Sequence, residues 1–237
     1  MKTPFLNTLP RLLTVLSLMF VLSPLELQAD DKDGFKSIFD GKTLEGWDGK
    51  ADFWSVKDGA ITGQTTAEKP TSGNTFCIYK GGKLGDFELR LKFKIVGGNS
   101  GIQYRSEDKG NNVVHGYQAD IDSGLGFMGI LYEEGGRGVL ANRGQKVEIN
   151  SAGEKKDLGK TIEDKVILDS LKKDDWNEYV VIAQGNHLVQ KINGHVTIDV
   201  TDSQQGKAKS EGILALQLHA GPPMLVQFKE IQLKQAK

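Results

Sequence analysis

Apolar and charged residues alternate strictly between Phe87 and Val96, where the chain reads FELRLKFKIV. Successive side chains of a strand point to opposite faces, so this pattern predicts a strand with one face on a core and the other in solvent. Asn193-Gly194 lies between two short apolar runs and predicts a hairpin turn. Further strands are expected over Tyr179–Ala183, His187–Ile192, His195–Val200, Gly212–His219 and Leu225–Leu233.

Helical patterns are scarce in this chain. Only Glu163–Lys172 has helix-like content, and residues 150–165 are rich in Lys, Glu, Asp and Gly, which indicates a solvated loop. Many short strands joined by Gly, Asn and Asp predict an all-β protein, built as a two-sheet antiparallel sandwich or jelly roll. We expect a single domain over residues 30–237.

The N-terminal residues predict an export signal. Lys2 and Arg11 precede a short apolar run, Leu12–Leu22, which is too short to span a bilayer comfortably. Ala29 precedes a charged stretch, so we expect a signal peptide over residues 1–29 that is cut after Ala29. An uncleaved N-terminal anchor is the alternative. We therefore expect a periplasmic or secreted protein with no transmembrane anchor after cleavage.

The charge balance argues against a nucleic-acid partner. The chain carries 30 Lys and Arg against 31 Asp and Glu, whereas binding to phosphates needs clustered basic residues. Cys77 is the one cysteine and cannot form an internal disulfide. It lies in an apolar run, which predicts a buried, unreactive thiol. Trp47, Trp54 and Trp176 are likewise expected in the core.

Polar residues that a core does not explain are concentrated between Asn99 and Arg143. If Asn99–Ser106 is a strand, Gln103 and Arg105 share one of its faces. Their hydrogen-bond donors suit sugar hydroxyls, a carbonyl oxygen or a carboxylate. The alternative is a solvated outer face on which Arg105 pairs with a nearby acid.

The next polar segment is His115–Asp122, in which Gln118, Asp120 and Asp122 alternate with apolar residues. Three polar side chains on one strand face would line a groove, with Asp120 as its central carboxylate. The alternative is an exposed strand that ends in a turn at Asp122.

The third polar segment, Gly129–Gly138, holds an aromatic, two carboxylates and an arginine between glycines. Tyr132 would stack on a sugar, and a turn at the glycines would bring Arg137 back over Glu133. Glu134 is expected to be solvated. The alternative is a polar hairpin tip with no ligand.

His219 ends an apolar strand next to a Gly-Pro-Pro loop, a common position for a site residue. His187 and His195 are expected at the surface of the Asn-Gly hairpin. No two histidines have the spacing of a zinc site. An oxygen-ligated Ca²⁺ or Mg²⁺ held by Asp side chains stays open.

Several motifs follow one another along the chain in a specific order. They are FDGKTLEGW from Phe39, WSVKDGAI from Trp54, NSGIQYR from Asn99, GYQADI from Gly116, LYE from Leu131, WNEY from Trp176 and GILALQLH from Gly212. On these motifs the chain resembles the 3-keto-disaccharide hydrolase domain family over about residues 34–234. Many members of that family carry a Glu before Gln118, where this chain has Gly116-Tyr117.

The resemblance implies a concanavalin A-like jelly roll and a carbohydrate substrate whose glucose ring has a ketone at carbon 3. Such a ketone acidifies the proton on carbon 2, so that a base can remove it and the glycosidic oxygen can leave carbon 1. The implied catalytic residues are Asp120 or Glu133 as base, Arg105 with Gln103 at the ketone oxygen, and His219 as acid or second base. The implied substrate-binding residues are Gln103, Gln118, Tyr132 and Arg137.

Two alternatives to this enzyme remain on the sequence. A bound divalent metal would replace Arg105 as the electrophile within the enzyme. A non-catalytic carbohydrate-binding module on the same scaffold belongs to a different class, and a fold alone does not exclude it. The cluster from Asn99 to Arg137 has few aromatics and many ionisable groups, which favours the enzyme. An ordinary endo-glucanase with two catalytic carboxylates ranks last.

Overall fold

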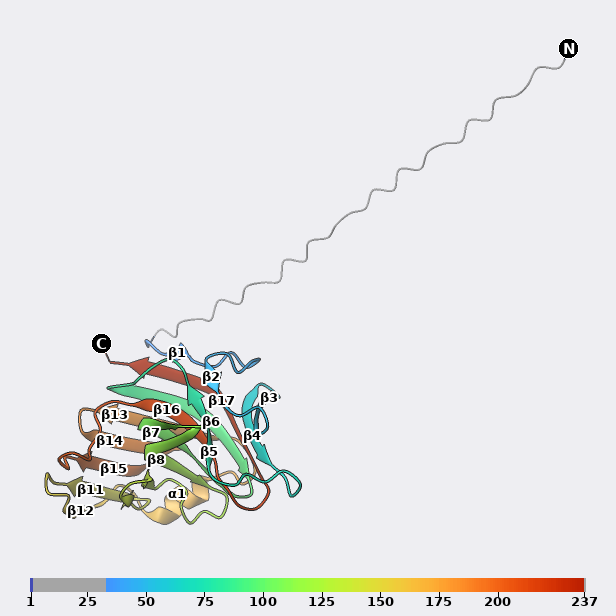
Figure 1. The fold of residues 1–237 in the computed structure, drawn as a ribbon. Helices are drawn as coiled ribbons and strands as arrows, with labels where there is room; N and C mark the ends of the chain where they lie inside the picture. Colours follow the sequence, from blue (N-terminus) through green and yellow to red (C-terminus); the bar gives the residue numbers. More distant parts are fainter. Residues whose placement is uncertain (2–32, 237) are drawn as a thin grey trace.

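The computed structural model describes Met1 and residues 33–236 as two stacked β-sheets with one short helix, α1 (Asp164–Ser170) (Figure 1). The predicted antiparallel sandwich is thereby confirmed. Within the described residues, no helix is long and apolar enough to cross a membrane. The expected signal peptide falls almost wholly on residues 2–32, which lie outside the described part of the chain.

The larger sheet, sheet A, has ten strands. Its strands, in spatial order, are β12 (Lys155–Lys160), β11 (Gln145–Ile149), β15 (His195–Asp202), β14 (His187–Ile192), β13 (Asn177–Gln184), β6 (Phe87–Val96), β17 (Met224–Gln235), β4 (Ala60–Thr65) and β3 (Trp54–Lys57), with β1 (Lys36–Ser37) beside β17. The expected strand over Phe87–Val96 is confirmed residue for residue, and β14 and β15 form the expected Asn-Gly hairpin.

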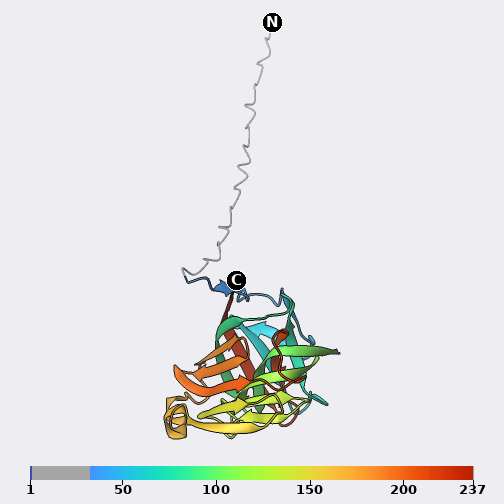
Figure 2. The ribbon, with the colours of Figure 1, turned by 90° about the vertical axis from the view of Figure 1, so that its left-hand side faces the viewer.

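The smaller sheet, sheet B, has seven strands. Its strands, in spatial order, are β10 (Gly138–Ala141), β9 (Leu131–Glu134), β8 (Val113–Asp122), β7 (Asn99–Gly110), β16 (Ile213–Leu218), β5 (Thr75–Tyr79) and β2 (Trp47–Asp48). The three polar segments of the sequence therefore become the neighbouring strands β7, β8 and β9. Figure 2 shows the strands of both sheets curving around a shared interior.

The core lies between the two sheets and follows the alternation of each strand. On sheet A the apolar residues of β6 from Phe87 to Ile95 are buried, while its charged residues and Val96 are more exposed. On sheet B the inward side chains include Tyr104 of β7, Tyr117 and Ile121 of β8, and Leu216 of β16. Because side chains alternate, the residues between them face outward.

The hairpin of β7 and β8 bends sharply near Arg105. The pairing register shifts between Tyr104 and Glu107, and Arg105 has a φ of 46°. Such a bulge adds twist and redirects a strand. Beyond it, Val114 packs with Phe76 of β5 in a second, smaller apolar cluster. The hairpin tip therefore folds over the outer face of sheet B.

Three local expectations need correction or completion. The stretch over residues 150–165 is not only a loop, because β12 pairs with β11 at the edge of sheet A. The expected helix near Glu163 is present as α1. Trp47 and Trp54 are buried as expected. Trp176 is not in the core, because its side chain is only partly buried and the ammonium groups of Lys94 and Lys229 lie over its ring.

Candidate functional site

Polar side chains are gathered on the outer face of sheet B, where its central strands lie side by side. Gln103 of β7 pairs with Gln118 of β8, which in turn pairs with Tyr132 of β9. Asp120 lies two residues beyond Gln118 on the same face. Gln217 of β16 adds a fourth strand, since its neighbours Leu216 and Leu218 are in the core. The structure thus brings the predicted residues Gln103, Gln118, Asp120 and Tyr132 onto one face, together with Gln217, which the sequence did not single out.

A chain of hydrogen bonds runs across this face and ends on Asp120. The Ser106 hydroxyl donates to Gln103 Oε1 at 2.8 Å, and Gln103 Nε2 donates to Gln118 Oε1 at 2.7 Å. Gln118 Nε2 lies 3.4 Å from Asp120 Oδ2, and Asn99 Nδ2 donates to Asp120 Oδ1 at 2.8 Å. Each donor points toward Asp120, so the carboxyl group is held in one orientation.

Burial raises the pKa of Asp120 to about 7. The amide donors of Asn99 and Gln118 oppose this rise, and the negative charges of Asp122 and Glu134 add to it. Asp120 is only 4% exposed. A carboxyl group with a pKa near neutrality can take up and release a proton at physiological pH, as a catalytic acid or base must.

Glu134, expected to be solvated, is instead bound on this face. Its Oε1 accepts from Asn74 Nδ2 at 3.2 Å and its Oε2 lies 3.4 Å from Gln217 Nε2. Its side chain thus connects β9 with β16 and with Asn74, which precedes β5. The alternation of a strand places Tyr132 and Glu134 on one face and Glu133 on the other. That signal was present in the sequence.

His219 follows β16 on the same face as Gln217. The next residue, Ala220, donates its backbone N–H to Asn74 Oδ1 at 3.0 Å. His219 Nδ1 lies 2.5 Å from the Ala220 carbonyl oxygen. A carbonyl only accepts, so the Nδ1 atom carries a proton in this contact. Continuing the register of β16 on β7 by three residues places His219 opposite Asn99.

Arg105 does not join this group. Its side chain is fully buried and donates to the carbonyl oxygens of Gly85, Gly185 and Lys209 and to Asp86 Oδ1, at 2.6–3.2 Å. These four bonds engage most of the guanidinium N–H groups. The expectation that Gln103 and Arg105 share a face is wrong, because the bulge at Arg105 interrupts the alternation.

Glu133 and Arg137 lie together, as the glycine turn predicted, but not with Asp120. Arg137 Nε donates to Glu133 Oε2 at 2.5 Å, and its Nη2 donates to Asp202 Oδ2 of β15 at 2.7 Å. The Tyr117 hydroxyl donates to the same Asp202 oxygen at 2.5 Å. We name Tyr117, Glu133, Arg137 and Asp202 the inter-sheet cluster, since it joins β8 and β9 of sheet B to β15 of sheet A. Glu133 and Arg137 therefore do not lie beside Asp120, although Glu133 lines a cleft of about 750 Å³ together with Arg105, His115 and Glu134.

The charges of the inter-sheet cluster compensate one another. Burial alone would raise the pKa of Asp202, but hydrogen bonds from Arg137 and Tyr117 hold it below its ordinary value. Burial would likewise lower the pKa of Arg137, and its bonds to Asp202 and Glu133 raise it instead. Asp202 was not found from sequence, because its partners come from distant strands.

The outer-face carboxylates are engaged by amide donors from neighbouring side chains. Among the described residues, no group of three His, Cys, Asp or Glu is arranged to hold an ion. The oxygens of Asp120 and Glu134 each face amide N–H donors, which repel a cation. Metal ligands instead converge their lone pairs on one point.

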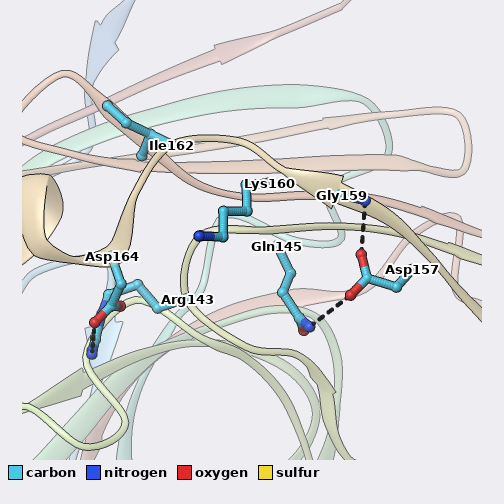
Figure 3. A pocket seen from close by; sticks show the side chains of 8 residues that line it. Arg143, Gln145, Asp157, Gly159, Lys160, Ile162 and Asp164 are labelled. Carbon is cyan, nitrogen blue, oxygen red and sulfur yellow. Dashed lines mark hydrogen bonds and ion pairs between the residues drawn. The ribbon is translucent and has the colours of Figure 1, made fainter.

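The described part of the chain has several hollows, of which two bear on the site. One, of about 480 Å³, is lined by residues of β11, β12 and the start of α1 (Figure 3). Its charged groups bind each other: Arg143 Nε donates to Asp164 at 2.5 Å, and Asp157 accepts from Gln145 and from the Gly159 N–H. None of the predicted site residues lines it. The other, of about 750 Å³, is lined by Ser106 and Glu134 among others.

Solved structures with the same fold include proteins named as a glycosyl hydrolase and as a carbohydrate-binding module. A Parabacteroides distasonis protein named, provisionally, as a glycosyl hydrolase is 17% identical, with a TM-score of 0.57 over 86% of this chain and 95% of that one. The carbohydrate-binding module CBM66 from Bacillus subtilis is 14% identical, with a TM-score of 0.53 over 80% of this chain and 96% of that one. At these identities the likeness shows the fold alone.

Sequence relatives are more specific. A protein of Bacteroides thetaiotaomicron named 3-keto-disaccharide hydrolase is 36% identical in an alignment 99 residues long. That alignment covers 35% of this chain and 33% of that protein. The aligned stretch is thus about a third of either protein. A family model covers far more, matching residues 34–234. The chain therefore belongs to the family of 3-keto-alpha-glucoside-1,2-lyase-like domains.

Proposed function

We propose that the outer face of sheet B cleaves 3-keto-glucosides, with Asp120 as the general base. The observation that carries the proposal is a buried carboxyl group with a pKa raised to about 7, held by amide donors on a face that collects polar side chains from four strands. Membership of the family and the name of the Bacteroides relative support the substrate class.

The chemistry needs one base and one proton donor. Asp120 takes the proton from carbon 2, and the electron pair of that C–H bond forms a double bond toward the ketone carbon, which leaves charge on the ketone oxygen. When the carbonyl re-forms, the C1–O bond breaks and the leaving oxygen takes a proton. Water can then add to the resulting carbon–carbon double bond. His219, which follows β16 at the edge of the same face, is proposed as the proton donor.

The donor proposed for the ketone oxygen is not Arg105, which the sequence suggested. The Arg105 guanidinium is occupied by backbone carbonyls and Asp86. Asn99 Nδ2 has two N–H groups, and only one is needed for its bond to Asp120. We assign the second N–H of Asn99 to the ketone oxygen, where a donor stabilises the charge that develops.

A carbohydrate-binding module on the same face is the second candidate. The side-chain amides of Asn74 and Gln217 on this face are groups that also bind sugar hydroxyls without any reaction. A module of this kind would bind both trehalose and 3-keto-trehalose and would release nothing from either.

Incubation with 3-keto-trehalose, with release of glucose followed over time, separates the two candidates. The enzyme releases glucose, and its kcat/KM falls as the pH drops through about 7, because Asp120 becomes protonated. Binding without release at any pH between 5 and 9 contradicts the enzyme and favours the binding module. Release that is unchanged in Asp120→Asn contradicts the base while leaving the activity in place.

Export completes the proposal, and its support is the sequence pattern before Asp30 alone. Mass spectrometry of the protein expressed in a bacterial host checks it. Mature protein recovered outside the cytoplasm should begin at Asp30. A chain that stays in the cytoplasm with residues 2–29 attached contradicts export.

A further inference from the structure

The cleft of about 750 Å³ has the size of a small-molecule site, roughly 300–1,000 Å³. One wall carries residues 133–136, and the segment from Gly206 to Ile213 also lines it. Among the described residues that line it, five are Lys or Arg and five are Asp or Glu, and none is Phe, Tyr or Trp. This balance suits a neutral, hydroxyl-rich ligand better than an ion or an aromatic group.

Two side chains connect the cleft with Asp120. Ser106 lines the cleft and begins the hydrogen-bond chain that passes through Gln103 and Gln118 to Asp120. Glu134 also lines the cleft, and its charge acts on Asp120. Asp120 does not itself line the cleft, so these two side chains are what link a ligand in the cleft to the group proposed as the base.

Glu134 is positioned as an acceptor for such a ligand. An ionised carboxylate has about four lone-pair sites, and the bonds from Asn74 and Gln217 take two of them. Its cross-strand partner is Gly116, which has no side chain to cover it. The Gln217 carboxamide is fixed by this contact, and its buried Oε1 has no partner. The contact thus holds Glu134 in place on the cleft wall.

We propose that this cleft is the subsite for the leaving sugar and that Glu134 accepts a hydrogen bond from one of its hydroxyl groups. The inference rests on the proposed function for the identity of the ligand. It makes Glu134 a specificity-determining residue, because a glycoside without a second sugar has nothing to offer it.

The test compares 3-keto-trehalose with methyl 3-keto-α-glucoside, which lacks the second sugar. Glu134→Gln should raise the KM for 3-keto-trehalose about 10- to 100-fold, the size expected for a hydrogen bond to a charged group. The KM for the methyl glucoside should stay unchanged, since its ring does not enter the cleft. Glu211→Gln is the matched control, because it removes the same charge from the same cleft at a side chain paired with Lys83.

Equal changes for both substrates, or no change for either, overturn the inference and leave the proposed function standing. If the wild-type protein turns over neither substrate, the proposed function fails, and calorimetric titration of the same proteins with the same two sugars decides the inference. A selective loss of 3-keto-trehalose affinity in Glu134→Gln then supports it, and equal affinities or no binding overturn it.

Discussion

Two neighbouring residues of β9 belong to different regions of the molecule. Glu134 faces outward and is held by side-chain amides, beside the polar group around Asp120. Glu133 also lines the cleft, but both of its carboxylate oxygens accept from Arg137 in the inter-sheet cluster. The difference shows that one strand can contribute to a ligand site on one face and to stability on the other, with the assignment made by alternation alone.

The two regions also differ in whether their buried carboxyl groups have a positively charged partner. In the inter-sheet cluster every buried charge has an opposite partner, so Asp202 stays ionised. On the outer face Asp120 has amide donors but, among the described residues, no cation bonded to it, and its pKa rises to about 7. Paired charge favours a fixed structure, whereas an unpaired carboxyl group can exchange its proton.

The largest expected effect is on activity. Asp120→Asn should lower kcat/KM for 3-keto-trehalose by about 10²- to 10⁴-fold, because the base is lost while the shape of the side chain is kept. Steady-state kinetics measures it, and circular dichroism checks that the fold is retained. A decrease in kcat/KM of less than tenfold would show that the outer face does not supply the catalytic base.

Removal of the cation from the inter-sheet cluster should act on stability instead. Arg137→Met leaves Glu133 and Asp202 buried without their partner and should cost about 3–5 kcal/mol in unfolding free energy. Urea denaturation measures the loss. Arg143→Met is the control, since it removes another arginine whose partner Asp164 is half exposed. Equal losses in the two variants would contradict the special position of Arg137.

The raised pKa of Asp120 predicts a pH-dependent stability. The folded chain holds this proton up to about pH 7, while the unfolded chain releases it near pH 3.8. The protonated folded form is therefore favoured at low pH, and this contribution is lost as the pH rises from about 4 to about 7. Over that range wild type should lose about 4 kcal/mol relative to Asp120→Asn. Paired denaturation curves at pH 4 and 8 check it; a constant difference between the two proteins would contradict the shift.

The smallest effects come from the two neighbouring glutamates themselves. Glu133→Gln should lower the unfolding free energy by about 1–3 kcal/mol, because it weakens a buried charged hydrogen bond. It should leave the ratio of KM values for 3-keto-trehalose and methyl 3-keto-α-glucoside unchanged. Glu134→Gln should change that ratio. Thermal melts measure the stability of both variants, and steady-state kinetics measures their KM ratios. A changed KM ratio in Glu133→Gln together with a lower stability of Glu134→Gln would refute the assignment of the two residues to their faces.

Much of the fold followed from local pattern. The alternation from Phe87 and the Asn193-Gly194 turn predicted β6 and the β14–β15 hairpin correctly. β12 was missed because Lys155–Lys160 is wholly exposed, so that no apolar face marks it as a strand. Its pairing with β11 depends on a contact that local sequence does not show.

The candidate site was predictable only as far as alternation continues. Gln103, Gln118 and Asp120 lie together because β7 and β8 are regular at those positions. Arg105 departs from the pattern because a non-glycine residue adopts a positive φ there, which no sequence signal announces. The position of Glu134 could have been predicted from the alternation of side chains, since Glu134 lies two residues from Tyr132 and therefore on the same face.

The most direct measurement is a crystal structure of the Asp120→Asn protein soaked with 3-keto-trehalose. The keto ring should lie on the outer face of sheet B with its carbon 2 against position 120, and the second ring should occupy the cleft beside Glu134. A sugar bound in the hollow beside Arg143 and Asp164 (Figure 3), or bound without contact to position 120 or to Glu134, would contradict the assignment of the site.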